Sequence, residues 1–190
     1  MQALKMVYQH PSLLSVDLDK IIDAHEQVNF VKGDFLLQKG QVANHYFVVA
    51  QGLVRTYLYD YNGNEITVGF FGNNELAIEV ASLFHRVPTQ EYMQCLTDCT
   101  LWKIDFDVFQ DLFLQIPGLA EWGRSWMSFE LFQSKMRATQ MITQPATQRY
   151  LQLMQERSQI VQQAPLKYIA SYLGITDTSL SRIRKEISHS

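Results

Sequence analysis

Hydroxyl-bearing and cationic side chains are concentrated near the C-terminus of this 190-residue chain. Hydroxyl groups can hydrogen-bond to base edges in a DNA groove, and lysine and arginine can neutralise backbone phosphates. This chemistry predicts double-stranded DNA as a partner, provided that the side chains share one face of a helix. The residues assigned to the contact are Thr176, Asp177, Thr178, Ser179, Ser181, Arg182, Arg184 and Lys185.

Residues 165–187 have the pattern of two short helices joined by a turn. Pro165 suits the first position of a helix, and Gly174 ends that helix because glycine enters the left-handed conformation at little cost. Thr176 or Asp177 can cap the second helix. A helix-turn-helix unit is therefore predicted, whose second helix would enter a major groove. The alternative is a helical hairpin with a solvated basic face. The apolar positions that recur at helical spacing are Ile169, Ala170, Leu173, Leu180, Ile183 and Ile187.

The charge of the chain is unevenly distributed. Residues 134–190 hold eight lysines and arginines against three acids, a net charge of +5, whereas residues 1–133 carry −8. The formal net charge of −3 conceals this division. A basic C-terminal segment suits a protein that binds a polyanion through that segment.

Several function classes are not expected from the sequence. It contains no paired nucleophile and base, no Gly-x-Gly-x-x-Gly loop and no cluster of metal ligands, so we expect no enzyme, no catalytic residue, no metal and no cofactor. His85 stands alone, without a second ligand nearby. Cys95 and Cys99 are expected to be half-buried strand residues rather than a disulfide. The chain lacks an apolar run of about 18 residues and a signal-peptide pattern, which predicts a cytoplasmic protein that does not enter a membrane.

Upstream of the basic segment, the sequence divides into helical and strand-rich parts. Residues 1–28 read as a short helical lead-in, and residues 28–105 as short strands broken by glycine, with a tight turn at Asn62-Gly63. A strand about every ten residues favours a sandwich or an antiparallel barrel. Residues 105–115 follow as a short acidic helix.

A long helix is predicted from Leu119 to Thr143, and Gln144-Pro145 should break it. Residues 146–157 would begin the second domain, and residues 158–164 read as a polar linker. The long helix could simply pack onto its own β-domain. Its apolar stripe comprises Leu119, Trp122, Trp126, Phe129, Phe132 or Gln133, Met136 and Met141.

The whole chain resembles the cyclic-AMP receptor/Fnr family of transcription regulators. The resemblance is carried by the glycine framework and by residues 165–187. It implies an α+β protein with an N-terminal β-jelly roll of the cyclic-nucleotide-binding type (residues 1–116), a dimerisation helix (117–144) and a helix-turn-helix domain (145–190). It also implies a homodimer, with Trp122, Trp126, Phe129 and Met136 at the interface. The framework motifs are Lys32-Gly33-Asp34, Gln38-Lys39-Gly40-Gln41, Tyr46-Phe47-Val48-Val49, Gly52-Leu53-Val54-Arg55 and Asn62-Gly63-Asn64-Glu65.

The effector pocket implied by the resemblance departs from the family pattern. Ile78 replaces a glycine, Glu79 matches the acid, and Thr89 and Gln90 stand where arginine and serine would hold the cyclic phosphate. Arg86, beside Pro88, is a nearby cation that could substitute, and the alternative is an ordinary surface position. Without the arginine a buried phosphate loses its charge partner. We therefore expect no response to cyclic AMP and an effector that is neutral, unknown or absent.

Family members usually add a two-stranded wing after the second helix, and the Ser-His-Ser that follows Ile187 predicts none here. The favoured function is a homodimeric, DNA-binding transcription regulator. The alternative is a ligand-sensing or protein-interaction module whose DNA-binding domain is degenerate.

Overall fold

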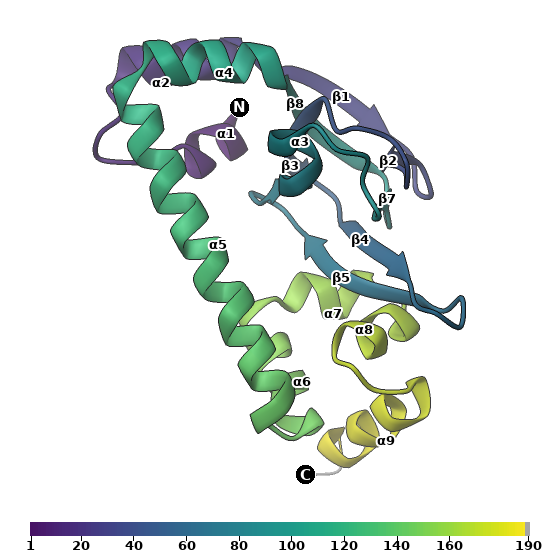
Figure 1. Ribbon diagram of the computed structural model, residues 1–190. Helices are drawn as coiled ribbons and strands as arrows, with labels where there is room; N and C mark the ends of the chain where they lie inside the picture. Colours follow the sequence, from purple (N-terminus) through teal and green to yellow (C-terminus); the bar gives the residue numbers. More distant parts are fainter. Residues whose placement is uncertain (189–190) are drawn as a thin grey trace.

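The computed structural model describes residues 1–188, in which an N-terminal β-domain is joined to a helical C-terminal region by one long helix (Figure 1). The β-domain contains two four-stranded antiparallel sheets, ordered β1-β8-β3-β6 and β2-β7-β4-β5. This confirms the predicted mixed fold with an N-terminal antiparallel β-domain, whereas the jelly-roll connection stays a prediction. The strands are β1 (Glu26–Phe30), β2 (Phe35–Leu37), β3 (His45–Gln51), β4 (Val54–Tyr59), β5 (Glu65–Phe71), β6 (Leu76–Ala77), β7 (Tyr92–Cys95) and β8 (Cys99–Asp105).

Helices precede, interrupt and follow the sheets. The long helix α5 spans 27 residues and ends one residue before Gln144-Pro145, as the sequence predicted. The helices are α1 (Gln2–Val7), α2 (Ser15–Asp23), α3 (Val80–His85), α4 (Phe106–Gln115), α5 (Pro117–Thr143), α6 (Ala146–Glu156), α7 (Ser158–Gln163), α8 (Leu166–Tyr172) and α9 (Asp177–Ser188). The last two residues of the expected domain 145–190 lie outside the described residues.

The N-terminal lead-in is two helices rather than one, and it is held to the β-domain by a buried polar network. The Tyr8 and Tyr46 hydroxyls lie 2.5 Å apart, and Tyr8 lies 3.1 Å from Nε2 of His25. The indole N–H of Trp122 donates to the Val7 carbonyl at 2.8 Å. Burial lowers the pKa of His25 to about 4, so its ring is neutral near pH 7. These contacts fix α1, α2 and the start of α5 against β3.

The β4–β5 hairpin follows from its turn residues. Gly63 has a φ of +81°, a conformation that glycine adopts without strain. The Asp60 carboxylate accepts hydrogen bonds from the backbone N–H groups of Asn62 and Asn64 at 2.8 and 2.9 Å. The turn expected at Asn62-Gly63 is confirmed.

Two local expectations were wrong. Residues 158–163 form helix α7 instead of a polar linker, because Ile160 anchors the helix in the C-terminal core with 1% of its surface exposed. So short a helix depends on such packing rather than on its intrinsic helix propensity. Cys95 and Cys99 are free thiols, as expected, but they are fully rather than half buried.

The C-terminal region packs against β5, the edge strand of its sheet. The Thr67 N–H donates to the Ser171 hydroxyl at 2.9 Å, and the Ser171 hydroxyl donates to the Glu65 carbonyl at 3.2 Å. Arg137 of α5 donates to the Val68 carbonyl. Side chains of two helices, α5 and α8, thus satisfy part of the open edge of the sheet, which would otherwise be a site for strand addition.

Candidate nucleic-acid interface and interdomain cavity

Helices α8 and α9 pack together through apolar side chains, and their polar side chains remain outside. Ile169, Ala170 and Leu180 are each 0% exposed, and Ile183 is 8% exposed. The connecting turn contains Gly174 at a φ of +66°. This geometry agrees with the two-helix pattern read from the sequence, apart from Pro165, which precedes the first helical residue instead of occupying it.

The cap of α9 is provided by Thr176. Its Oγ1 accepts a hydrogen bond from the Ser179 N–H at 3.2 Å and lies 3.0 Å from the Ser179 hydroxyl. Asp177 lies in the first turn, where a carboxylate is favoured by the helix dipole. Thr176, Asp177 and Ser179 therefore stabilise the start of the helix, a role that removes part of their freedom to contact bases.

The outer face of α9 carries the remaining predicted DNA contacts. Thr178, Ser181, Arg182 and Lys185 are exposed and follow one another at helical spacing on the side opposite Leu180. Arg184 is exposed on a flank of the same helix. The helix thus presents hydroxyl groups and cations together on one accessible surface.

The predicted effector residues do not converge on one cavity. Arg86 donates to the Ala43 carbonyl and to Oδ1 of Asn44, both at 2.6 Å, and its guanidinium lies 5.0 Å from the Phe106 ring. It is therefore engaged in fixing a loop. The carboxylate of Glu79 accepts the Ser82 N–H at 2.6 Å and caps α3.

Thr89 is also structural, because its N–H and carbonyl bond to the loop at Gly40 and Gln41 and only 3% of its surface is exposed. Gln90 is exposed on the surface. Ile78 alone of the predicted set lines the larger cavity of the protein. The effector pocket therefore stays a prediction, with Thr89 at the position expected of the phosphate-binding arginine.

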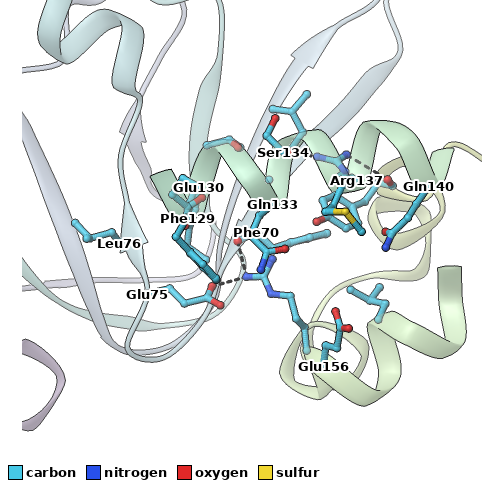
Figure 2. A pocket seen from close by; sticks show the side chains of 18 of the residues that line it. Phe70, Glu75, Leu76, Phe129, Glu130, Gln133, Ser134, Arg137, Gln140 and Glu156 are labelled. Carbon is cyan, nitrogen blue, oxygen red and sulfur yellow. Dashed lines mark hydrogen bonds and ion pairs between the residues drawn. The ribbon is translucent and has the colours of Figure 1, made fainter. Parts of the chain in front are cut away.

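The larger cavity lies between the β-domain, α5 and the C-terminal helices, and has a volume of about 820 Å³. Figure 2 shows Glu75, Glu130, Gln133, Arg137 and Gln140 around it. Four carboxylates and three guanidinium groups line it. Sequence reasoning missed this cavity because its walls come from segments far apart along the chain, from Val7 to Leu173.

The guanidinium groups of the cavity are occupied by protein acceptors. Arg137 donates to the carbonyls of Val68 and Tyr172, and Arg149 to those of Gln144 and Leu173. Arg157 donates to the Phe70 carbonyl at 2.8 Å and to the Glu75 carboxylate.

Two carboxylates of the cavity, by contrast, have no hydrogen-bond or ion-pair partner among residues 1–188: Glu91 and Glu130. Burial, followed by the charge of Glu79, raises the pKa of Glu91 to about 7. Burial and then Glu75 raise the pKa of Glu130. Within the described chain no group of three or more His, Cys, Asp or Glu residues is arranged to hold a metal ion.

The expected dimer residues lie on the inner side of α5. Trp122 is 6% exposed and packs in the chain's own core, so it is unavailable to a second copy. Trp126, Phe129 and Met136 line the interdomain cavity. The dimer interface at these residues stays a prediction, and the start of α5 is used to hold α1.

A different stripe on α5 was missed. Its members recur with alternating spacings of four and three residues, the pattern of a coiled-coil seam. Met127 is 50% and Leu131 72% exposed, and the small residues Ser134 and Ala138 would permit close approach of another helix. Aromatic residues at neighbouring positions hid this pattern in the sequence. The stripe consists of Met127, Leu131, Ser134, Ala138 and Met141.

Residues 27–115 match the family described as Cyclic nucleotide-binding domain. A curated relative, the cAMP-dependent protein kinase type II regulatory subunit of Drosophila melanogaster, is 26% identical over 115 residues. The match covers 60% of this chain but 29% of the relative, so the chain spans less than a third of that protein's length.

Solved structures extend the likeness to the C-terminal region. FixK2 from Bradyrhizobium japonicum superposes with a TM-score of 0.75 at 14% identity, covering 87% of this chain and 85% of the other. The c-di-GMP responsive global regulator CLP from Xanthomonas campestris gives a TM-score of 0.71 at 17% identity, covering 93% and 92%. At these identities the likeness shows the fold.

The unpaired carboxylate of Glu91 should cost stability at alkaline pH. When the pKa of an acid is higher in the folded state than in the unfolded state, the protein loses stability as the pH rises from the unfolded-state pKa to the folded-state pKa. The Glu91→Gln variant should therefore be more stable than the wild type at pH 8, by about 1–2 kcal/mol after allowance for partial exposure. The difference should vanish near pH 4.5. Urea unfolding at both pH values measures it.

Glu121→Gln provides the matched control, because Glu121 is exposed on α5 and pairs with Arg124 away from the cavity. A Glu91→Gln protein that is less stable than the wild type at pH 8 would contradict the prediction.

Proposed function

We propose that this protein is a DNA-binding transcription regulator in which α9 enters the major groove. The observation that carries the proposal is the outer face of α9, where Thr178, Ser181, Arg182 and Lys185 are exposed together while the inner face is buried on α8. Arginine can contact guanine O6 and N7 through two hydrogen bonds, and short hydroxyl side chains fit several base edges. The local positive charge of the C-terminal region supplies attraction to phosphates.

A second copy of the chain completes the proposed assembly. A single α9 reads only a few base pairs, whereas two copies can engage half-sites about 34 Å apart. The stripe Met127–Met141 on α5 is our choice for the contact. It pairs exposed apolar side chains with small residues, and two of its members, Ser134 and Met141, also line the interdomain cavity. A twofold contact between two such stripes is self-complementary.

A ligand-sensing or protein-interaction module without DNA binding is the second candidate. The overall charge of −3 favours it, since long-range attraction of the whole molecule to DNA is absent. The two candidates are separated by selecting fragments of random-sequence DNA with the purified protein. Affinity that falls steeply with salt supports the first, and weak binding insensitive to salt supports the second.

Arg182→Ala should weaken binding to a selected DNA site by about 1–3 kcal/mol, because a bidentate contact with a base is lost. Fluorescence anisotropy at fixed salt measures the change. Lys135→Ala is the control, since Lys135 is exposed on α5 rather than α9. Equal affinities of the Arg182 variant and the wild type would remove Arg182 from the interface.

Leu131→Glu combined with Ala138→Glu should convert the dimer to monomers in sedimentation, because four carboxylates would face one another across the seam. Ser128→Glu with Thr139→Glu adds the same charges on another exposed face of α5 and should leave the dimer intact. A dimer that survives the first pair but dissociates with Phe129→Glu would place the interface on the cavity side.

Cyclic AMP should not bind with low-micromolar affinity. Thr89 is tied to the Gly40–Gln41 loop, Arg86 is bonded to Ala43 and Asn44, and Glu79 adds negative charge. Loss of a buried charge partner costs about 2–5 kcal/mol. Calorimetric titration is the measurement, and saturation at low micromolar cyclic AMP would show that one of these side chains rearranges to accept phosphate.

A further inference from the structure

Cys95 and Cys99 form a pair of free thiols at the boundary between the two sheets. Cys95 ends β7 and Cys99 begins β8, and these strands belong to different sheets. Their side chains interact with each other, although Cys95 is only 1% and Cys99 3% exposed. The described chain offers them no group of metal ligands to join. The chemistry open to the pair is therefore that of a dithiol.

The surroundings of Cys99 favour its thiolate over that of Cys95. The Thr97 hydroxyl lies 3.9 Å from Sγ of Cys99. Interaction with the Cys95 thiol, and to a smaller extent with this hydroxyl, lowers the pKa of Cys99 to about 7, although burial opposes the change. The pKa of Cys95 is raised, first by Cys99 and then by burial. Because the thiolate is the nucleophilic form of cysteine, Cys99 is the sulfur suited to attack an oxidant.

The segment between the two cysteines lies close to solvent. Asp98 is exposed and Thr97 is half-buried, and the Thr97 carbonyl lies 3.3 Å from Sγ of Cys99. A small local opening of such a turn costs less free energy than unfolding of the domain. An oxidant of about the size of water can therefore reach the sulfur without disruption of the sheets.

The same turn carries part of the contact with the C-terminal helices. Leu96 packs in the C-terminal core together with Leu53, whose carbonyl lies 3.7 Å from Sγ of Cys99. Gly52 adjoins that sulfur so closely that a Cβ would lie 2.6 Å from it. The Gly52 carbonyl in turn accepts a hydrogen bond from Gln159 of α7 at 2.8 Å. A displacement of the Cys99 sulfur is therefore transmitted to α7.

We propose that Cys95 and Cys99 are a site of reversible oxidation, at which hydrogen peroxide converts the two thiols to a disulfide and thereby loosens the contact of α7 with the β-domain. The Cys99 thiolate attacks one peroxide oxygen, the O–O bond breaks, and the leaving hydroxide combines with the proton that Cys99 released. Cys99 is then a sulfenic acid. The Cys95 sulfur attacks Sγ of Cys99, the S–O bond breaks, and the departing hydroxide takes the Cys95 proton as a second water. The two sulfurs lose two electrons in total, which the peroxide gains.

Formation of the bond must move the Cys99 sulfur, because a covalent S–S bond is much shorter than the separation of two thiols in contact. The sulfur then leaves its place beside Gly52 and the carbonyl of Leu53. Both residues support the C-terminal helices, through Gln159 and through the C-terminal core respectively. Backbone amides of α7 should therefore exchange with solvent faster in the oxidised protein than in the reduced protein.

The test uses the full-length reduced protein and hydrogen peroxide at pH 7. The number of thiols titrated after denaturation should fall from two per chain to none, and dithiothreitol should restore both. Peptide mass spectrometry should show the loss of two hydrogen atoms from the peptide that contains both cysteines. The folded protein should react about tenfold faster than the urea-unfolded protein, because an ordinary thiol with a pKa near 8.5 is only a few per cent ionised at pH 7.

Two single variants separate the roles of the sulfurs. Cys95→Ser should stop at a sulfenic acid on Cys99, which dimedone captures, whereas Cys99→Ser should react at least about tenfold more slowly. Hydrogen exchange of wild-type α7 should be faster after oxidation, and that of α2, at the far end of the β-domain, should not change (Figure 1).

The proposal is overturned if the thiols of the folded protein persist in peroxide that oxidises the unfolded protein, or if dithiothreitol does not restore them. It also fails if the two variants react at the same rate, or if exchange of α7 is the same in both redox states. The wild-type measurements decide the matter even where a variant does not fold. None of them involves DNA, so their failure leaves the DNA-binding proposal intact.

Discussion

The open edge of β5 is the constraint on which the arrangement of the two halves depends. An edge strand carries unpaired backbone groups that need partners when they are buried. Here Arg137 bonds to the Val68 carbonyl, Arg157 to the Phe70 carbonyl, and Ser171 to both Glu65 and Thr67. Each such hydrogen bond contributes about 1 kcal/mol net, and leaving a buried group unpaired costs more. Satisfying the edge therefore fixes α5, α6 and α8 together.

Burial of Arg55 reinforces this docking. Its side chain is 0% exposed and lies between the rings of Tyr57 and Tyr168, 4.0 and 3.4 Å from their centroids. Glu65 supplies its counter-ion at 2.6 Å. Because Tyr168 belongs to α8, moving that helix would expose the guanidinium and break the stack. A buried arginine of this kind favours one relative position of the domains over others, since a shifted position would leave the charge poorly paired.

The sequence predicted those features of the fold that depend on residues close together in the chain. Gly63, Gly174 and Pro145 act through their own backbone preferences, so the hairpin, the turn between α8 and α9 and the end of α5 were all foreseen. The pairing of β6 with β3, and of β7 with β2 and β4, was not foreseen, because these partners lie far apart along the chain. The predicted effector set likewise failed to converge: Arg86 found partners at Ala43 and Asn44, about 40 residues upstream. The cavity depends on contacts such as Arg157 with Phe70, which no local pattern contains.

The long helix α5 separates the acidic part of the chain from its basic part. A helix of 27 residues is about 40 Å long. The acidic helices α2 and α4 lie at its first end, and α9 lies beyond its other end (Figure 1). The turn at Gly174 approaches Met141 near that second end, which fixes this placement. Charges interact weakly beyond a Debye length of about 8 Å at physiological ionic strength. The acids of α2 and α4 therefore oppose an approaching polyanion only slightly, and α9 can present its cations to DNA although the chain as a whole is negative.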